Sequence, residues 1–157
     1  MELAVLAQLP FFQGMPQWAL AHLAEVAAEE EVPAGEMVLR QADRARAVHF
    51  LLAGSVQILL RIGEEDLLVA VVRRPGELLG WSAFRAPYRY TASVRAEEPC
   101  RLVRVPAAGF EELFERDPAF AYHTLQRVAA GVTNRLEQAR LRLFLPPGQP
   151  VGEEATR

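Results

Sequence analysis

A glycine-containing segment between two apolar runs carries residue types that could bind an anion. Gly76 and Gly80 bracket its first half, and glycine adopts backbone conformations that turn successive N–H groups toward one spot. A short helix beginning near Trp81 to Ala83 would aim its first N–H groups at the same place, and Thr91 would add a hydroxyl. The segment therefore predicts an anion-binding loop. The alternative is that the glycines only turn the chain between strands.

Residues that could act as nucleophiles or metal ligands are scattered along the chain. His22, His49 and His123 lie in three different regions, with no His-x-His pair. Cys100 is the only cysteine, which excludes an internal disulfide and a cysteine-based zinc site. Ser82 lacks the pattern of a nucleophile elbow and is better explained by a place at the start of a helix. We therefore predict a protein that is not an enzyme and has no metal site.

The composition is that of one globular domain with a single core. The 157 residues are 51% hydrophobic and 24% charged, and the net charge of −3 gives no attraction to nucleic acid or to an anionic membrane. No apolar run is long enough to span a bilayer, and the first residues lack the basic region of a signal peptide. We expect a cytoplasmic protein that binds neither membrane nor nucleic acid directly.

The hydrophobic period changes twice, which divides one domain over residues 1–145 into three parts. Residues 1–28 have a helical period, residues 29–105 alternate as β-strands do, and the helical period returns over 106–145. Many short strands with turn signals between them predict a mainly β fold, an antiparallel β-roll or jelly-roll barrel flanked by helices. The expected strands are 29–32, 37–40, 47–53, 55–62, 66–73, 91–96 and 100–105.

The last part is expected to form a short helix over 107–117 and then a long one. Asp117 is a suitable N-cap and Pro118 a suitable first-turn residue for a helix that continues to about Leu145. Its apolar side chains form one stripe, which could pack on the barrel or pair with a second chain. The proline-containing residues 146–157 are expected to be a disordered tail.

The order of these parts resembles the cyclic-nucleotide-binding domain of the catabolite activator (Crp/Fnr-type) family. The stretches that carry the resemblance are PFFQGMP, PAGEMVLRQADRARAVHFLLAGSVQI, PGELLGWSAFRAPYRYTASVRA and CRLVRVPAAGFEELFERDP. The third is similar to the phosphate-binding cassette of that family. The resemblance implies a cyclic nucleotide or another small phosphorylated ligand in the cassette, and a homodimer through the helix over 118–145. We expect no helix-turn-helix unit in the residues that follow this helix.

Two positions depart from the family's ligand-binding motif. The family places a Glu after the second glycine, as acceptor for the ribose hydroxyl, and here that position is Trp81, which can only donate. The family places an Arg before Ser/Thr-Ala, and here that position is Tyr90, before Thr91. Each lost charge-assisted contact costs about 1.5–3 kcal/mol, so we expect weak binding of cyclic AMP and cyclic GMP. Arg89 is the remaining candidate charge partner, although alternation along an extended segment turns it away from the face of Tyr90. The Gln41-Ala42-Asp43 turn also departs from the glycine that is usual there.

The sequence thus predicts a stand-alone regulatory sensor that signals through its C-terminal helix. The predicted ligand-binding residues are Gly80, Trp81, Ser82, Ala83, Arg89, Tyr90 and Thr91. The alternative function is a degenerate module that binds no small molecule and serves for dimerisation or for docking a protein partner. The two readings differ in whether Trp81 and Tyr90 line a cavity or fill it.

Overall fold

The computed structural model describes residues 1–144, and its helices gather at the two ends of the sequence. The chain begins with helices α1 (Leu3–Gln8), η1 (Pro10–Phe12) and α2 (Gln17–Val26), and it ends with α3 (Ala107–Arg116) and α4 (Pro118–Phe144). Between them lie β1 (Ala28–Val32), β2 (Met37–Leu39), β3 (Ala47–Ala53), β4 (Val56–Ile62), β5 (Glu65–Val72), β6 (Leu78–Leu79), the short 3-10 helix η2 (Trp81–Phe84), β7 (Ser93–Ala96) and β8 (Cys100–Pro106).

The strands form two four-stranded antiparallel sheets, in the orders β1-β8-β3-β6 and β2-β7-β4-β5. The predicted β-roll flanked by helices is therefore confirmed, and each of the seven expected strands lies within two residues of its expected bounds. Strand β6 was not predicted. Its two residues are too few to show an alternating pattern, and it exists because Leu78 and Leu79 pair with Phe50 and His49 of β3.

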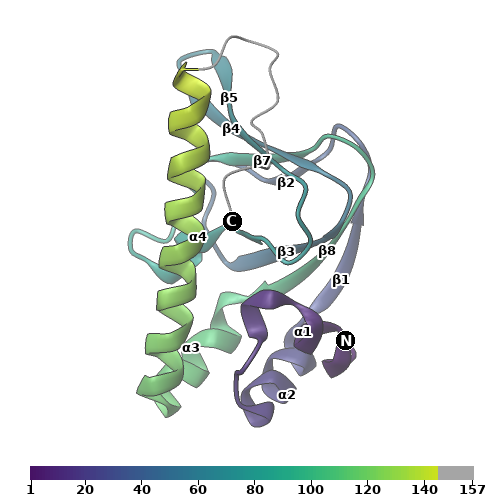
Figure 1. Ribbon diagram of the computed structural model, residues 1–157, viewed down its shortest axis with the longest axis vertical. Helices are drawn as coiled ribbons and strands as arrows, with labels where there is room; N and C mark the ends of the chain where they lie inside the picture. Colours follow the sequence, from purple (N-terminus) through teal and green to yellow (C-terminus); the bar gives the residue numbers. More distant parts are fainter. Residues whose placement is uncertain (145–157) are drawn as a thin grey trace.

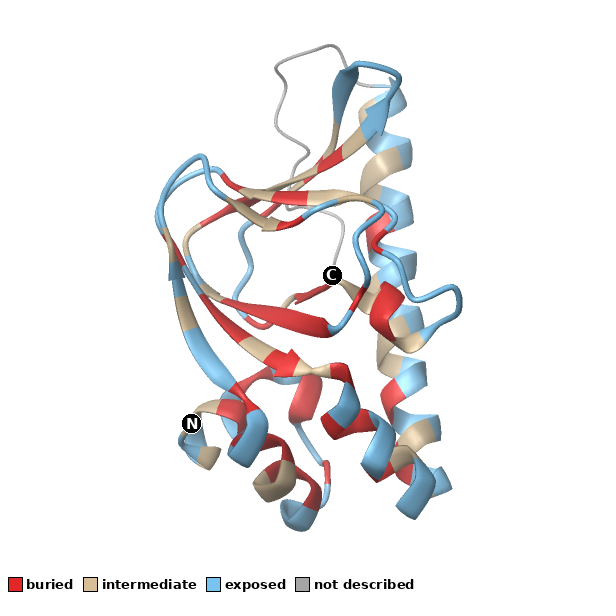
Figure 2. Cartoon of the chain, turned by 180° about the vertical axis from the view of Figure 1, so that it is seen from behind, coloured by how far each residue is buried: buried red, intermediate tan, exposed pale blue. Residues whose placement is uncertain are grey.

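The core continues from the sheets into the N-terminal helices. Figure 1 shows α1, α2 and α3 together at one end of the molecule, beside β1 and β8. Phe12, Phe50 and Phe110 come from three parts of the sequence and are almost fully buried, with the Phe12 and Phe50 ring centres 4.9 Å apart. Figure 2 shows buried residues in the strands of both sheets and in the helices at this end. The helical lead and the barrel thus share one core.

Helix α4 begins as the sequence predicts. Asp117 Oδ1 accepts hydrogen bonds from the backbone N–H groups of Ala119 (2.9 Å) and Phe120 (3.2 Å), which is the geometry of an N-cap. The helix then passes along the edges of both sheets and reaches β5 (Figure 1). The predicted disordered tail, 146–157, lies outside the described residues.

The apolar stripe predicted on α4 packs only in part on its own chain, where Val128 is partly buried against the core. Four of its members are more than a third exposed, namely Leu125, Val132, Leu136 and Leu143. The buried side chains of α4 are instead Phe120, Thr124 and Arg135. A charged residue therefore lies on the face of α4 that packs against the barrel, and this decides the chemistry of the site.

Candidate ligand pocket

The candidate cassette is a sharp turn that leads from β6 into η2. Gly80 has φ of +79° and is the residue before the first turn of η2. A Cβ atom at Gly80 would lie 3.0 Å from both Leu39 Cδ1 and Tyr90 Cε1. Both the positive φ and this close packing therefore favour glycine at this position. The short helix that the sequence predicts near Trp81 to Ala83 is present over Trp81–Phe84.

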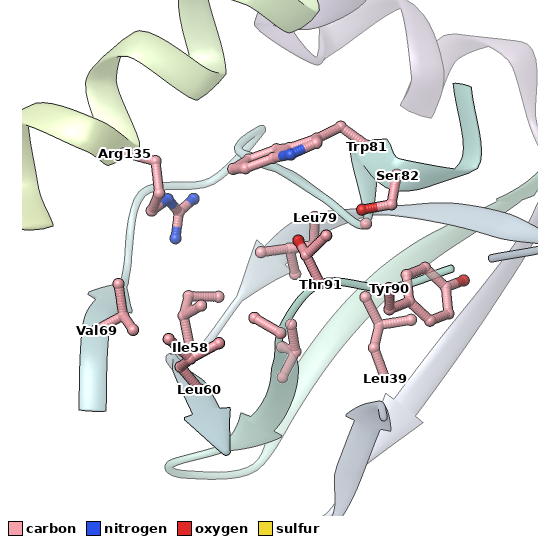
Figure 3. A pocket seen from close by; sticks show the side chains of 13 residues that line it. Leu39, Ile58, Leu60, Val69, Leu79, Trp81, Ser82, Tyr90, Thr91 and Arg135 are labelled. Carbon is pink, nitrogen blue, oxygen red and sulfur yellow. The ribbon is translucent and has the colours of Figure 1, made fainter. Parts of the chain in front are cut away.

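A cavity of about 310 Å³ lies between this turn, the β2-β7-β4-β5 sheet and α4. Figure 3 shows the side chains of Ile58, Leu60 and Val69 on one side and Trp81 and Arg135 on the other. Trp81 and Tyr90 line this cavity and leave about 310 Å³ beside them, so the two side chains do not fill it. Ligand pockets in proteins start at about this volume.

Five of the seven predicted ligand-binding residues line this cavity: Gly80, Trp81, Ser82, Tyr90 and Thr91. The other two lie elsewhere. Ala83 is buried in the core behind the turn. Arg89 points away, as strand alternation indicates, and its Nη1 donates to the carbonyl oxygen of Ala42 at 2.7 Å.

Tyr90 contributes its ring to the cavity wall and its hydroxyl to the backbone. The Tyr90 hydroxyl donates to the carbonyl oxygen of Ala47 at 2.7 Å, away from the cavity lining. Burial raises the pKa of Tyr90 above its usual value, so the phenol is neutral at physiological pH. The residue in the place of the family's phosphate-binding arginine therefore presents an apolar surface.

Arg135 of α4 also lines the cavity, and sequence reasoning missed it. The residue is only 8% exposed, its Nη2 donates to Glu77 Oε2 at 3.1 Å, and its Cζ lies 5.7 Å from the centre of the Trp81 ring. Its Nη1 is buried and has no hydrogen-bond partner within the part of the chain that the structure describes. Burial lowers the pKa of Arg135 and Glu77 opposes that shift, but a guanidinium keeps its charge in proteins. The sequence shows several arginines on this helix, and no local pattern distinguishes the buried one.

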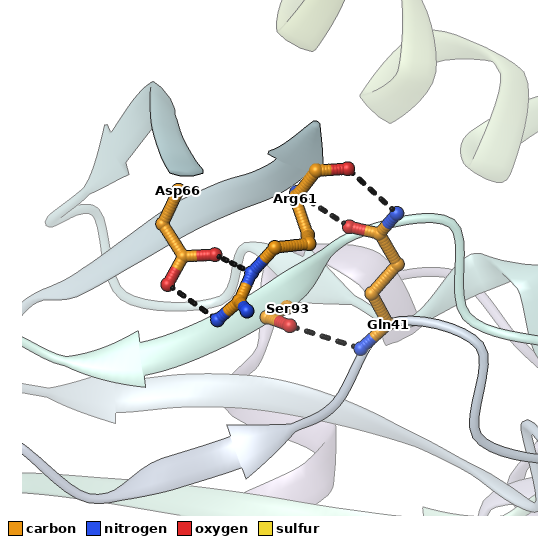
Figure 4. Close-up of polar contacts among 4 residues, drawn as sticks. All are labelled: Gln41, Arg61, Asp66 and Ser93. Atoms are coloured by element: carbon orange, nitrogen blue, oxygen red, sulfur yellow. Dashed lines mark hydrogen bonds and ion pairs between the residues drawn. The ribbon is translucent and has the colours of Figure 1, made fainter. Parts of the chain in front are cut away.

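The turn between β2 and β3 is held by the side chain of Gln41, in a segment where the family usually has a glycine. Ala42 has φ of +71°, a conformation that side chains disfavour. Figure 4 shows how Gln41 secures this turn: its Oε1 accepts from the Arg61 N–H at 2.7 Å, and its own N–H donates to Ser93 Oγ at 2.9 Å. Arg61 in turn pairs with Asp66 through Nε at 2.6 Å. These contacts fix the rim of the sheet that forms one wall of the cavity.

Residues 29–117 match the sequence model of the cyclic nucleotide-binding domain, which covers more than half of the chain. The chain therefore belongs to the cyclic nucleotide-binding domain family, a family of regulatory binding domains, as the cassette and the β-roll indicate.

Relatives and solved structures agree with this assignment. A proposed cyclic nucleotide-binding protein from Geobacter metallireducens is 28% identical, with a TM-score of 0.77 over 87% of this chain and 98% of that one. The catabolite activator protein of Thermus thermophilus has the same fold, with 23% identity and a TM-score of 0.65 over 86% of this chain and 62% of that one. A proposed potassium channel protein of Rhodopseudomonas palustris is 26% identical over 132 residues, which are 84% of this chain and 31% of the relative. The chain thus spans less than a third of this relative. No helix within residues 1–144 has the length and apolarity needed to cross a membrane.

Proposed function

We propose that this domain is a regulatory sensor that binds a small anionic ligand in the cavity between the cassette and α4. One observation carries the proposal: Trp81 and Ser82 of the cassette line the same cavity as Arg135 of α4. A ligand in that cavity contacts the barrel and the C-terminal helix at once. Binding then favours one position of α4 relative to the barrel, and α4 transmits the change.

A panel of ligands tests the proposal through the melting temperature. The panel contains cyclic mononucleotides, cyclic dinucleotides, nucleotides, phosphorylated metabolites and small organic anions. A ligand that binds only the folded chain stabilises it by RT ln(1 + [L]/Kd), so weak ligands are detected at millimolar concentration. Any shift should persist in Arg89→Ala, because Arg89 points away from the cavity, and weaken in Trp81→Ala, which removes a wall. A shift that Trp81→Ala leaves unchanged would place the ligand elsewhere.

Signalling through α4 is tested separately, by hydrogen exchange. We expect the ligand to slow exchange of the α4 amides around Arg135, because the ligand adds a contact between this turn and the barrel. Protection confined to the barrel would refute the role of α4.

A second function, dimerisation through α4, rests on the exposed stripe. Leu125, Val132, Leu136 and Leu143 are exposed on the helix face that does not pack on the barrel, and their helical spacing suits pairing with the same helix of a second copy. Light scattering at tens of micromolar tests this: the chain should have the mass of a dimer, and Leu136→Glu the mass of a monomer. A monomeric wild type would refute it. A dimer with no ligand from the panel would favour the docking or dimerisation module over the sensor.

A further inference from the structure

The wall of the cavity is apolar apart from one charged group and the hydroxyls of Ser82 and Thr91. The aliphatic side chains of β2, β4, β5, β6 and β7 that reach it are Leu39, Ile58, Leu60, Val69, Leu79 and Val94. Among the described residues, Arg135 is the only charged side chain in its lining. An occupant would therefore touch hydrocarbon over most of its surface, two hydroxyl groups, and a single charged group, the guanidinium of Arg135 (Figure 3).

The protein provides a hydrogen-bond partner for one of the two terminal nitrogens of the Arg135 guanidinium. Its Nη2 is engaged by Glu77, which does not line this cavity. Its Nη1 is buried without a partner among residues 1–144, in a residue whose side chain is more than nine-tenths buried. Buried donors are almost always paired in folded proteins, so an unpaired one in a residue that lines a cavity indicates an acceptor supplied by a ligand.

The same wall offers few partners to a sugar or a nucleobase, because besides Arg135 its side-chain polar groups are the Ser82 and Thr91 hydroxyls and the Trp81 ring N–H. Trp81 has no acceptor for a ribose hydroxyl, and the Tyr90 hydroxyl is already bonded to Ala47. Polar groups that enter an apolar cavity without partners lose their hydration and gain nothing in return. The chemistry of the cavity therefore fits a ligand whose polar atoms are confined to one end.

We propose that this cavity binds a compact organic anion with an apolar body and a single charged head, and that Arg135 of α4 donates Nη1–H to that head. The inference rests on the proposed sensor function and names the class of its ligand. A volume of 310 Å³ corresponds to about ten water molecules at their share of liquid volume, and so to a ligand of about ten non-hydrogen atoms. Octanoate has this size and this distribution of charge.

The experiment is a calorimetric titration of the whole chain with octanoate and with octanamide, its uncharged counterpart. Wild type should bind octanoate at least about tenfold more tightly than octanamide, because only the charged head forms a charge-assisted hydrogen bond with Arg135. Arg135→Gln should remove that preference. The matched control is Arg140→Gln, since Arg140 lies on the same helix and is exposed, and it should bind octanoate as wild type does.

Glu77→Gln provides a test of opposite sign. Removing the carboxylate beside Arg135 removes its repulsion of an anionic head, so octanoate should bind several-fold more tightly to this variant. A merely structural role of the Glu77–Arg135 pair predicts weaker or unchanged binding instead. Two comparisons still test the proposal if Arg135→Gln does not fold: Glu77→Gln against wild type, and octanoate against octanamide on wild type.

Three results would overturn the ligand class, and they differ from the failure of the sensor proposal. These are equal affinity for octanoate and octanamide, tighter binding of cyclic AMP than of octanoate, and no octanoate binding to wild type at 1 mM. If any of these occurs while another ligand of the thermal-shift panel binds through Trp81, the sensor function stands and only the ligand class is wrong. If the whole panel and octanoate fail, both proposals fail.

Discussion

Replacing Gly80 with alanine should destabilise the fold more than the same change at Gly35. Both glycines have positive φ, +79° at Gly80 and +85° at Gly35, so both substitutions carry the cost of about 1–2 kcal/mol that an L-residue has in this conformation. They differ in the space for the new methyl group. At Gly35 no atom lies within 4 Å, whereas at Gly80 the methyl would lie 3.0 Å from Tyr90 Cε1 and 3.3 Å from the Ala47 carbonyl oxygen.

Neither neighbour can move aside cheaply. The Tyr90 ring is tied by its hydroxyl to Ala47 at 2.7 Å, and the Ala47 carbonyl belongs to strand β3. Overpacking of this kind costs about 1–3 kcal/mol, which gives about 2–5 kcal/mol in total for Gly80→Ala and about 1–2 kcal/mol for Gly35→Ala. The additional loss at Gly80 corresponds to a further fall in melting temperature of about 2–12 °C for a domain of this size.

Urea denaturation of the two variants measures this difference. We expect both to keep the wild-type m-value and to lower the transition midpoint, with the larger shift for Gly80→Ala. If Gly80→Ala were no less stable than Gly35→Ala, the close packing of Leu39, Tyr90 and β3 around the cassette turn would be wrong. The shape of the cavity would then be wrong with it.

Three other predictions test the packing away from the cavity. Burial, helped by the positive charge of Arg104, lowers the pKa of His49 to about 4 from 6.5. As the pH falls, His49 therefore binds its proton in the unfolded chain before it does so in the folded chain, and the free energy of unfolding should fall by about 3 kcal/mol between pH 6.5 and pH 4. An equally large fall in His49→Gln would contradict this. Asp117→Ala should lower stability by about 1 kcal/mol in urea through loss of the N-cap, while Asp117→Asn should be near wild type. The Cys100 thiol is buried, which raises its pKa, so Ellman's reagent should react with it only when the chain opens; prompt reaction without denaturant would show that β8 is not packed as described.

The sequence by itself determined the elements and the turn of the cassette. Strand alternation and the turn residues between strands are properties of neighbours, so the bounds of β1 to β5, β7 and β8 could be predicted, as could the start of α4 at Asp117. Local sequence patterns also predicted a glycine turn at Gly80 before η2, and an Arg89 side chain on the opposite face from Tyr90. Family resemblance then indicated which turn is the candidate ligand site, and this turn lines the cavity.

Tertiary structure decided which side chains meet in the cavity. Strand β6 forms because β3 is beside it, and the Tyr90 hydroxyl reaches Ala47, 43 residues away in the sequence. The largest difference between the sequence prediction and the structure concerns α4. Helical periodicity singles out its apolar stripe, yet the barrel packs against the face that carries Arg135, and Glu77, 58 residues earlier, is its partner. A single buried guanidinium has no periodic signal in the sequence, because its burial depends on how the whole helix is placed against the barrel.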